Sequence, residues 1–191
     1  FPYTTLFRSR TLGRGAARTG PAARPPAGEP MPDPRPFPEI DRPGALALNA
    51  AHEVETAPLD APGLEALLAA AVLARAPRGP DGRTRALLIL LDETADAPSP
   101  NWRRFAARHP RFLYVDRVIV APEARRAGLA RGLYAEAIAR ACARGVPLCA
   151  EVNLEPPNPV SDAFHAALGF RETGRARLAA GRRVRYLERA P

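Results

Sequence analysis

The sequence predicts one α/β (α+β) domain in which helices cover a mixed sheet. Strand-like and helix-like segments alternate from residue 46 to residue 189, which is typical of this fold class. The chain has 191 residues, 46% of them hydrophobic, and this is enough for one substantial core. No apolar run approaches the ~18–20 residues that cross a bilayer, so we expect no contact with a membrane.

The first half of the chain predicts short elements separated by polar loops. A proline followed by leucines at helical spacing predicts a helix over 62–75. A run that is apolar on both faces predicts a buried strand over 85–91. The remaining elements expected here are a strand at 46–49 and a helical turn at 102–108.

The second half has the clearer periodicity. An inner stripe of apolar residues predicts an amphipathic helix over 128–144. Gly169 is suited to end a second helix, expected over 159–168. In order, the expected elements are a strand at 112–120, the helix at 128–144, a strand at 148–153, a helix at 159–168, and a hairpin of 170–178 and 183–189.

Residues 1–30 are not expected to belong to the fold. Residues 1–9 read FPYTTLFRS, which resembles a translated sequencing adapter, and Met31 is the only methionine. We therefore expect translation to start at Met31; an arginine-rich transit peptide is the alternative, although its prolines would break an amphipathic helix. Residues 31–44 are proline-rich and read as an extended lead-in, and 45–189 as a single domain.

The charge is carried by arginine alone. All 28 basic residues are arginine, and the net charge of +8 falls to +4 without residues 1–30. Lysine nucleophiles and a P-loop lysine are therefore excluded. No base-stacking aromatics accompany the arginines, so nucleic acid is not an expected partner. Two cysteines and three scattered histidines predict neither a disulfide framework nor a metal site, and a cytoplasmic location is the default.

The strongest chemical signal is a strand that runs through a turn into a helix. Backbone N–H groups at a helix N-terminus, together with arginine guanidinium groups, can bind phosphate. An ordinary turn with solvated arginines is the alternative. The strand contains Val118, Ile119 and Val120, and the turn contains Arg125, Arg126, Ala127, Gly128, Leu129 and Ala130.

This segment resembles motif A of the GNAT (GCN5-related) N-acetyltransferase family, Gln/Arg-x-x-Gly-x-Gly/Ala. A second segment also resembles the family: Asn158 precedes Ala163, Phe164-His165 and Leu168-Gly169-Phe170. The resemblance covers roughly residues 45–189. The runs around Tyr114–Arg117 and Glu151–Pro159 resemble a bacterial subgroup of predicted acetyltransferases.

The resemblance implies a GNAT-like sheet, mostly antiparallel, with helices on both faces and splayed central strands. It also implies acetyl-CoA as co-substrate and no metal. The loop from Arg125 to Ala130 would hold the diphosphate, and Val118–Val120 would line the pantetheine arm, with the Val120 N–H as an oxyanion donor. Asn158 would bond the same arm; its alternative role is to cap the helix that follows.

Acetyl transfer to a protonated amine needs a group that removes a proton. Glu151 and Asp116 are the candidates because each interrupts an apolar strand. An ion pair with an arginine is the alternative for Asp116. His165 stands where many relatives have a proton-donating tyrosine, and the alternatives are a packed histidine, or Tyr134 or Tyr114 as the donor.

The expected function is therefore acetyl-CoA-dependent N-acetyl transfer, directly to a primary amine of a small molecule or a peptide, by a monomer or homodimer. The alternative is a domain of the same fold without turnover, which binds CoA or an acidic partner. The sequence indicates neither the acceptor nor the acyl-chain preference.

Overall fold

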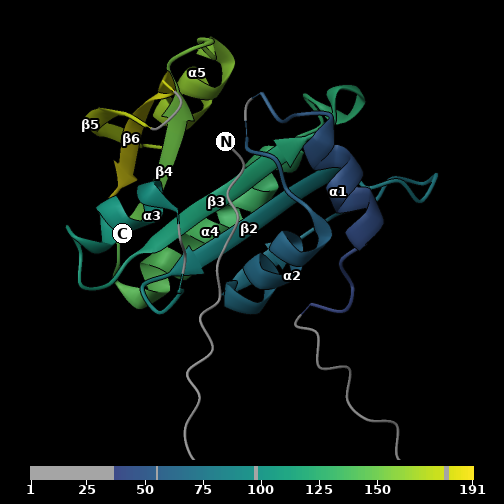
Figure 1. Cartoon of the computed structure of the whole chain (residues 1–191), viewed down its shortest axis with the longest axis horizontal. Helices are drawn as coiled ribbons and strands as arrows, with labels where there is room; N and C mark the ends of the chain where they lie inside the picture. The colour runs from purple at the N-terminus through teal and green to yellow at the C-terminus, as the bar shows by residue number, and fades with distance from the viewer. Residues whose placement is uncertain (1–36, 55, 97–98, 179–180) are drawn as a thin grey trace, which may run out of the picture. The chain divides into compact units, whose positions relative to one another are not determined.

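The computed structural model describes residues 37–191, apart from 55, 97–98 and 179–180 (Figure 1). The expectations for residues 1–30 and for most of the proline-rich lead-in lie outside the described residues. No helix in the described part of the chain is long and apolar enough to cross a membrane.

The described chain forms one six-stranded sheet in the order β1-β2-β3-β4-β6-β5. The strands are β1 Leu73–Arg75, β2 Ala86–Asp92, β3 Leu113–Val120, β4 Leu148–Asn153, β5 Arg171–Arg177 and β6 Arg183–Arg189. The helices are α1 Arg42–Ala50, α2 Ala61–Ala70, α3 Pro100–Ala106, α4 Leu129–Arg144 and α5 Pro159–Ala167, with a 3₁₀ turn η1 at Pro122–Ala124. All neighbouring strands are antiparallel except β3 and β4.

The two central strands separate soon after they meet. β3 and β4 pair only through Leu113 with Leu148 and Tyr114 with Cys149. Beyond these pairs β4 turns away from β3 and continues with β6 toward α5 (Figure 1). The predicted mostly antiparallel sheet with splayed central strands is therefore confirmed.

Each face of the sheet carries its own core. On one face, α1, α2 and α3 cover a buried cluster that includes Leu64, Phe105 and Tyr114. On the other, α4 and α5 cover a cluster that includes Leu133 and Tyr134. Figure 1 shows α1 and α2 on the near side of β2 and β3, with α4 behind them. Helices on both faces agree with the predicted fold class.

The expected strand at 46–49 is wrong, because these residues belong to α1. Asp41 caps this helix with a side-chain bond to the Gly44 N–H (3.2 Å), and a four-residue apolar run cannot by itself distinguish a strand from a helix. The helix begins inside the segment assigned to the extended lead-in, where Ile40 is also buried. The predicted helix over 62–75 ends early, at Ala70, because β1 pairs with β2.

Candidate active site

Two residues of the turn between β3 and α4 have a left-handed backbone conformation. Arg126 has φ 65° and Gly128 has φ 80°. Left-handed residues within such a turn direct successive N–H groups toward one side, which creates an anion-binding concavity. The loop predicted to bind a diphosphate therefore has a suitable backbone.

The N-terminus of α4 is open. The first helical bond joins the Gly132 N–H to the Gly128 carbonyl (2.9 Å), so the N–H groups of Leu129, Ala130 and Arg131 have no partner within the helix. No side chain caps α4, and a Cβ placed on Gly128 would meet nothing within 4 Å. The other α-helices of the described chain are capped by Asp41, Asp60, Ser99 and Asn158. This N-terminus has the space and the donors that a phosphate group needs.

Two arginines flank this open helix end. Arg125 and Arg126 are exposed, and neither makes an ion pair with a residue that the structure describes. Ala127 beside them is also exposed, and Ala130 is small enough to leave the helix end accessible. The guanidinium groups are therefore available to phosphate oxygens.

Backbone groups of β3 face the gap between β3 and β4. The Ala121 N–H donates to the Arg85 carbonyl on the β2 side (2.9 Å). Because N–H directions alternate along an antiparallel strand, the N–H groups of Val118 and Val120 point toward β4. The side chain of Ile119 packs into the core beneath α1 and α2. The two valines thus present donors that pair with no described strand, at the place where the sequence predicts an acyl-pantetheine arm.

Glu151 lies at the narrow end of this gap. It is two residues beyond Cys149, the last residue of β4 that pairs with β3. Its Oε2 accepts a hydrogen bond from the Tyr114 hydroxyl (2.8 Å), and its Oε1 accepts one from Asn101 Nδ2 (2.9 Å). Asn101 Oδ1 in turn accepts the hydroxyl of Tyr186 (3.1 Å). The carboxyl is therefore bonded by two different parts of the fold, β3 and α3, and β6 supports it indirectly through Asn101.

The environment makes Glu151 a carboxyl that titrates near neutrality. Burial raises its pKa from an ordinary value of 4.5 to about 7, and the charge of Asp116 also raises it. The hydrogen bonds from Tyr114 and Asn101 lower the pKa and offset part of this rise. A general base works best when its pKa lies near the working pH.

Asp116 forms an ion pair with an arginine, which is the alternative to a catalytic role for this residue. Its Oδ2 lies 3.3 Å from Arg117 Nε, and both side chains are about nine-tenths buried. Burial raises the pKa of the Asp116 carboxyl, against the lowering effect of Arg117. Arg117 also donates to Asn49 Oδ1 and to the Ala57 carbonyl (3.1 Å). This pair therefore ties β3 to α1 and to the segment that follows it.

His165 lies on α5 and is buried against α4. Its Nδ1 lies 2.8 Å from the Ser161 carbonyl, which can only accept, so Nδ1 carries the proton of the neutral ring. Nε2 then accepts the Tyr134 hydroxyl (2.8 Å). Burial lowers the pKa of the His165 imidazole. In this arrangement the histidine has no proton at Nε2 to donate.

Asn158 caps α5, as its alternative role predicts. Its Oδ1 accepts the N–H of Ser161 (3.0 Å), and Pro159 follows at the first helical position. The cap uses only the oxygen, and Asn158 Nδ2 donates to no residue that the structure describes. Nδ2 remains available for a second role.

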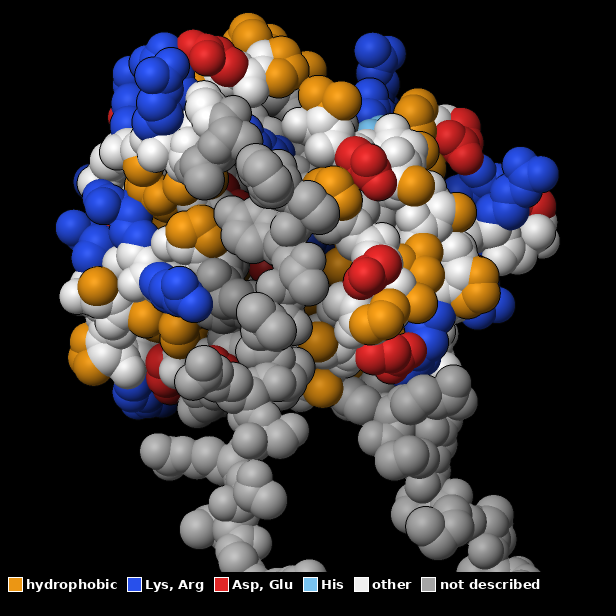
Figure 2. All heavy atoms as spheres, viewed as in Figure 1, with side chains coloured by type: hydrophobic (Ala, Val, Ile, Leu, Met, Phe, Trp, Pro, Cys, Tyr) orange, Lys and Arg blue, Asp and Glu red, His pale blue; other side chains and the backbone are white. Residues whose placement is uncertain are grey.

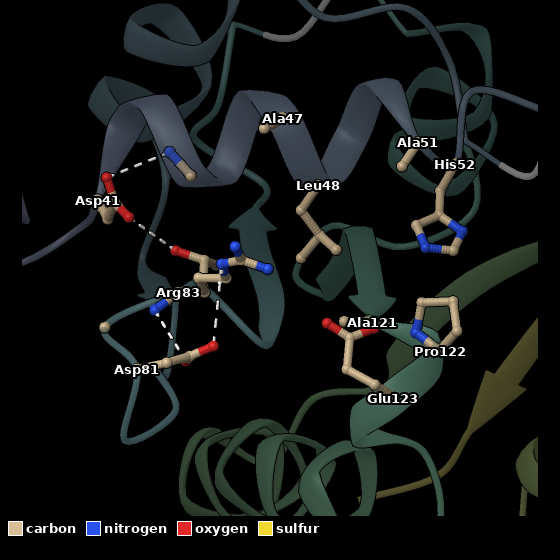
Figure 3. Close-up of a pocket in the computed structure, with 13 residues that line it drawn as sticks. Asp41, Ala47, Leu48, Ala51, His52, Asp81, Arg83, Ala121, Pro122 and Glu123 are labelled. Atoms are coloured by element: carbon tan, nitrogen blue, oxygen red, sulfur yellow. Dashed lines mark hydrogen bonds and ion pairs between the residues drawn. The ribbon is translucent and has the colours of Figure 1, made fainter.

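A separate cavity of about 550 Å³ lies beside α1 (Figure 3). The loop of Asp81 and Arg83 and the residues Pro122 and Glu123 form its other walls. The carboxylates at its edge carry negative charge, which does not suit a diphosphate. We therefore place the candidate phosphate site at the open end of α4 and not in this cavity.

The arginine-rich hairpin of β5 and β6 forms a basic face (Figure 2). Arg175 pairs with Glu172 (2.6 Å), and Arg183 pairs with Glu155 (2.7 Å). Exposed ion pairs of this kind contribute little to stability. The partial neutralisation weakens the case for an acidic partner at this hairpin.

Sequence patterns did not connect Asn101 or Tyr186 with Glu151. Tyr186 stands opposite Glu151 in the β4–β6 ladder, so both side chains lie on the same face of the sheet. This neighbourhood depends on β6 inserting between β4 and β5, an order that local patterns do not reveal. The inward alternation of Val184 and Tyr186 was the available signal.

Comparisons with known proteins agree with this geometry. Residues 96–170 match the family model of the acetyltransferase (GNAT) family. Naa20 of Chaetomium thermophilum, solved in complex with a bisubstrate analogue, is 20% identical with a TM-score of 0.59, and the alignment covers 78% of this chain and 83% of that one. The ribosomal-protein-S18-alanine N-acetyltransferase of Escherichia coli is 20% identical with a TM-score of 0.52, over 78% and 87% of the two chains. A search of curated proteins found no match.

At these identities the solved structures show a shared fold. The resemblance to the GNAT acetyltransferase family is thereby confirmed, by the family match over residues 96–170 and by the GNAT fold of the described chain.

Proposed function

We propose that the protein is an N-acetyltransferase that moves an acetyl group from acetyl-CoA directly to a primary amine of a small molecule or a peptide. The observation that carries the proposal is the position of Glu151, a carboxyl with a pKa of about 7 at the narrow end of the β3–β4 gap. The family match over residues 96–170 supports acetyl transfer as the reaction class.

Residues of the loop before α4 fit the co-substrate. The uncapped N–H groups of α4 and the guanidinium groups of Arg125 and Arg126 would hold its diphosphate. Asn158 Nδ2 would donate to its pantetheine arm. Acetyl-CoA supplies an activated thioester, and the Val120 N–H, which points into the gap, would stabilise the negative charge that develops on the thioester oxygen.

Glu151 is the proposed general base. Its carboxylate would take a proton from the acceptor ammonium, and the free amine would then form the new C–N bond as the C–S bond breaks. The sulfur leaves as a thiolate, and it takes up the second proton, which the attacking nitrogen releases as it becomes an amide. Asp116 is the weaker candidate because Arg117 holds its carboxylate, and His165 would act by holding Tyr134 in place.

The test is release of CoA thiol from acetyl-CoA in the presence of amino acids, polyamines, aminoglycosides or peptide N-termini. We expect release with at least one class, and a loss of about 10²–10⁴-fold in kcat for Glu151→Gln with unchanged CoA binding. Because the chain contains no lysine, acetyl-lysine detection on protein acceptors has no background from the enzyme's own side chains.

The same assay distinguishes the enzyme from the alternative, a domain of the same fold that binds CoA without turnover. A protein that gains thermal stability with CoA but releases no thiol with any acceptor is a binding domain. A protein that gives no calorimetric signal with CoA has no cofactor site at α4, and the proposal fails.

A further inference from the structure

We infer that Asn101 and Tyr186 are positioning residues for Glu151, and that they set where its carboxylate lies and how readily it takes a proton. The inference rests on the proposed function, in which Glu151 is the base. It concerns two side chains that would touch neither the co-substrate nor the acceptor. Their action would pass through hydrogen bonds that run from β6 through α3 to β4.

The direction of these bonds follows from the chemistry of the groups. A carboxylate oxygen can only accept, so the Asn101 amide must present Nδ2 to Glu151 Oε1 (2.9 Å). Asn101 Oδ1 then faces Tyr186 and must accept its hydroxyl proton (3.1 Å). Glu151 thereby sets the orientation of the amide, and the Tyr186 hydroxyl supplies the bond that its oxygen needs in that orientation.

Asn101 differs from the other asparagines of the described chain in what it binds. Asn49 Nδ2 donates to the Ala57 carbonyl (3.0 Å), Asn153 Nδ2 donates to the Val54 carbonyl (3.3 Å), and Asn158 caps α5. Each of these three side chains bonds a backbone group, and Asn49 also accepts from the side chains of Thr56 and Arg117. Among the described residues, the Asn101 side chain bonds side chains alone, and only 8% of its surface is exposed. A buried polar network of this kind specifies a position because each group needs its partner.

The ring of Tyr186 is itself held in place. Phe105 packs edge-on against it with ring centroids 5.5 Å apart, and the guanidinium carbon of Arg104 lies 4.5 Å from the ring centroid. Gly174 on the neighbouring strand leaves room for Arg104, because a Cβ there would come within 2.6 Å of Arg104 Nη2. The hydroxyl of Tyr186 therefore has a defined direction.

Titratable groups on three neighbouring elements interact with Glu151. Tyr114 and Asp116 lie on β3, and the charge of Glu151 also acts on Tyr134 of α4 and on Tyr186 of β6. Arg104 of α3 acts on Tyr186. Among the residues that the structure describes, only the side chains of Tyr114 and Asn101 are bonded to the carboxylate. Removing either donor removes a stabilising bond to the charged form.

The experiment measures the protonation of Glu151 directly. The full chain is labelled with ¹³C at glutamate carboxyls, its Glu151 signal is assigned by comparison with Glu151→Gln, and the midpoint of titration is followed by NMR. We expect Asn101→Leu to raise the midpoint by about one pH unit. Tyr186→Phe, which keeps the ring packing, should raise it by a smaller amount. The acid limb of the kcat/KM profile should move upward by the same shifts.

Trp102→Phe is the matched control. It lies on the same helix and loses the bond from Trp102 Nε1 to the Asp92 carbonyl (3.0 Å), without touching Glu151. We expect a lower Tm and an unchanged midpoint. An equal shift in the control, or no shift in folded Asn101→Leu and Tyr186→Phe, overturns the inference.

The titration needs no turnover. Shifted midpoints in a protein without acetyl transfer would refute the proposed function and leave the positioning role standing. Acetyl transfer by a protein in which the Asn101 and Tyr186 variants leave the Glu151 midpoint unchanged would refute the positioning role and leave the proposed function standing.

Discussion

The hydroxyl of Tyr114 donates a 2.8 Å hydrogen bond to the carboxylate of Glu151, across the point at which β3 and β4 stop pairing. Tyr114 is the last residue of β3 in the parallel ladder, and Glu151 is the first residue beyond it on β4 whose side chain lies on the same face. The two side chains therefore close the narrow end of the gap. This places a proton acceptor at the end of the gap into which the N–H groups of Val118 and Val120 point.

The pH dependence of acetyl transfer should follow Glu151. Because burial raises the pKa of this carboxyl to about 7, the active carboxylate is lost as the pH falls below 7. We expect kcat/KM to fall about tenfold per pH unit below that value and to be flat just above it. A profile measured with an acceptor of constant charge tests this. A rate that does not change between pH 5 and 8 would exclude Glu151 as the base.

Protein stability should also depend on the protonation of Glu151, but it should favour the protonated carboxyl, whereas acetyl transfer needs the carboxylate. The folded-state pKa is about 7 and the ordinary value is 4.5, so between these values the folded chain binds a proton that the unfolded chain has released. The contribution of Glu151 to stability is therefore greatest at low pH and declines as the pH rises from 4.5 to 7. Urea unfolding should show the unfolding free energy of the wild type falling relative to that of Glu151→Gln as the pH rises across that window. A constant difference would contradict the raised pKa.

Gly128 and Gly132 offer a matched pair of substitutions. Gly128 has φ 80°, so Gly128→Ala should cost about 1–2 kcal/mol and distort the phosphate-binding turn. Gly132 lies within α4, where a Cβ also meets nothing within 4 Å, so Gly132→Ala should stabilise the protein by about 0.5–1 kcal/mol. Calorimetry should show weaker CoA binding for the first variant alone. Equal loss in both would mean that crowding, and not backbone conformation, weakens binding.

The buried pair of Asp116 and Arg117 should behave as a structural unit. Arg117→Met leaves the Asp116 carboxylate without its partner and should cost about 3–5 kcal/mol. Adding Asp116→Asn should recover part of this loss, which denaturant unfolding measures. Asp116→Asn alone should retain most acetyl transfer. A loss as large as that of Glu151→Gln would move the base to Asp116.

His165 should carry its proton on Nδ1. The Ser161 carbonyl and the Tyr134 hydroxyl set this tautomer, and two-bond ¹H–¹⁵N spectra of the imidazole distinguish it. Tyr134→Phe removes the donor to a buried nitrogen and should cost about 1–3 kcal/mol. A ring protonated on Nε2 would restore His165 as a proton donor.

The sequence predicted the parts of the fold that have long or uniform periodicity. The expected strand at 148–153 and the second strand of the hairpin, 183–189, agree with β4 and β6, and the helix at 128–144 differs from α4 by one residue. The strand predicted at 46–49, which belongs to α1, was wrong because the apolar run is short. The residue that caps this helix, Asp41, lies within a proline-rich stretch. β1 was missed because three residues carry no period, and pairing with β2 decides their conformation.

For the candidate site, local sequence located single residues but not their neighbours. Glu151 and the loop before α4 stand out as a charge in an apolar strand and a glycine between arginines. The bonds to Glu151 from Asn101 and Tyr114, by contrast, join residues 50 and 37 positions apart. Only the strand order and the docking of α3 bring them together, and neither has a signature in a short window.

The short junction between β3 and β4 has a mechanical consequence. Within the described sheet, the halves β1-β2-β3 and β4-β6-β5 share ladder bonds only where residues 113–114 meet residues 148–149. Elsewhere the two halves are joined by α4, which contacts β2, β3 and β4, and by side-chain bonds such as those of Glu151 to Tyr114 and Asn101. The width of the opening therefore depends on helix packing and side-chain bonds, and not on a continuous ladder between the two central strands.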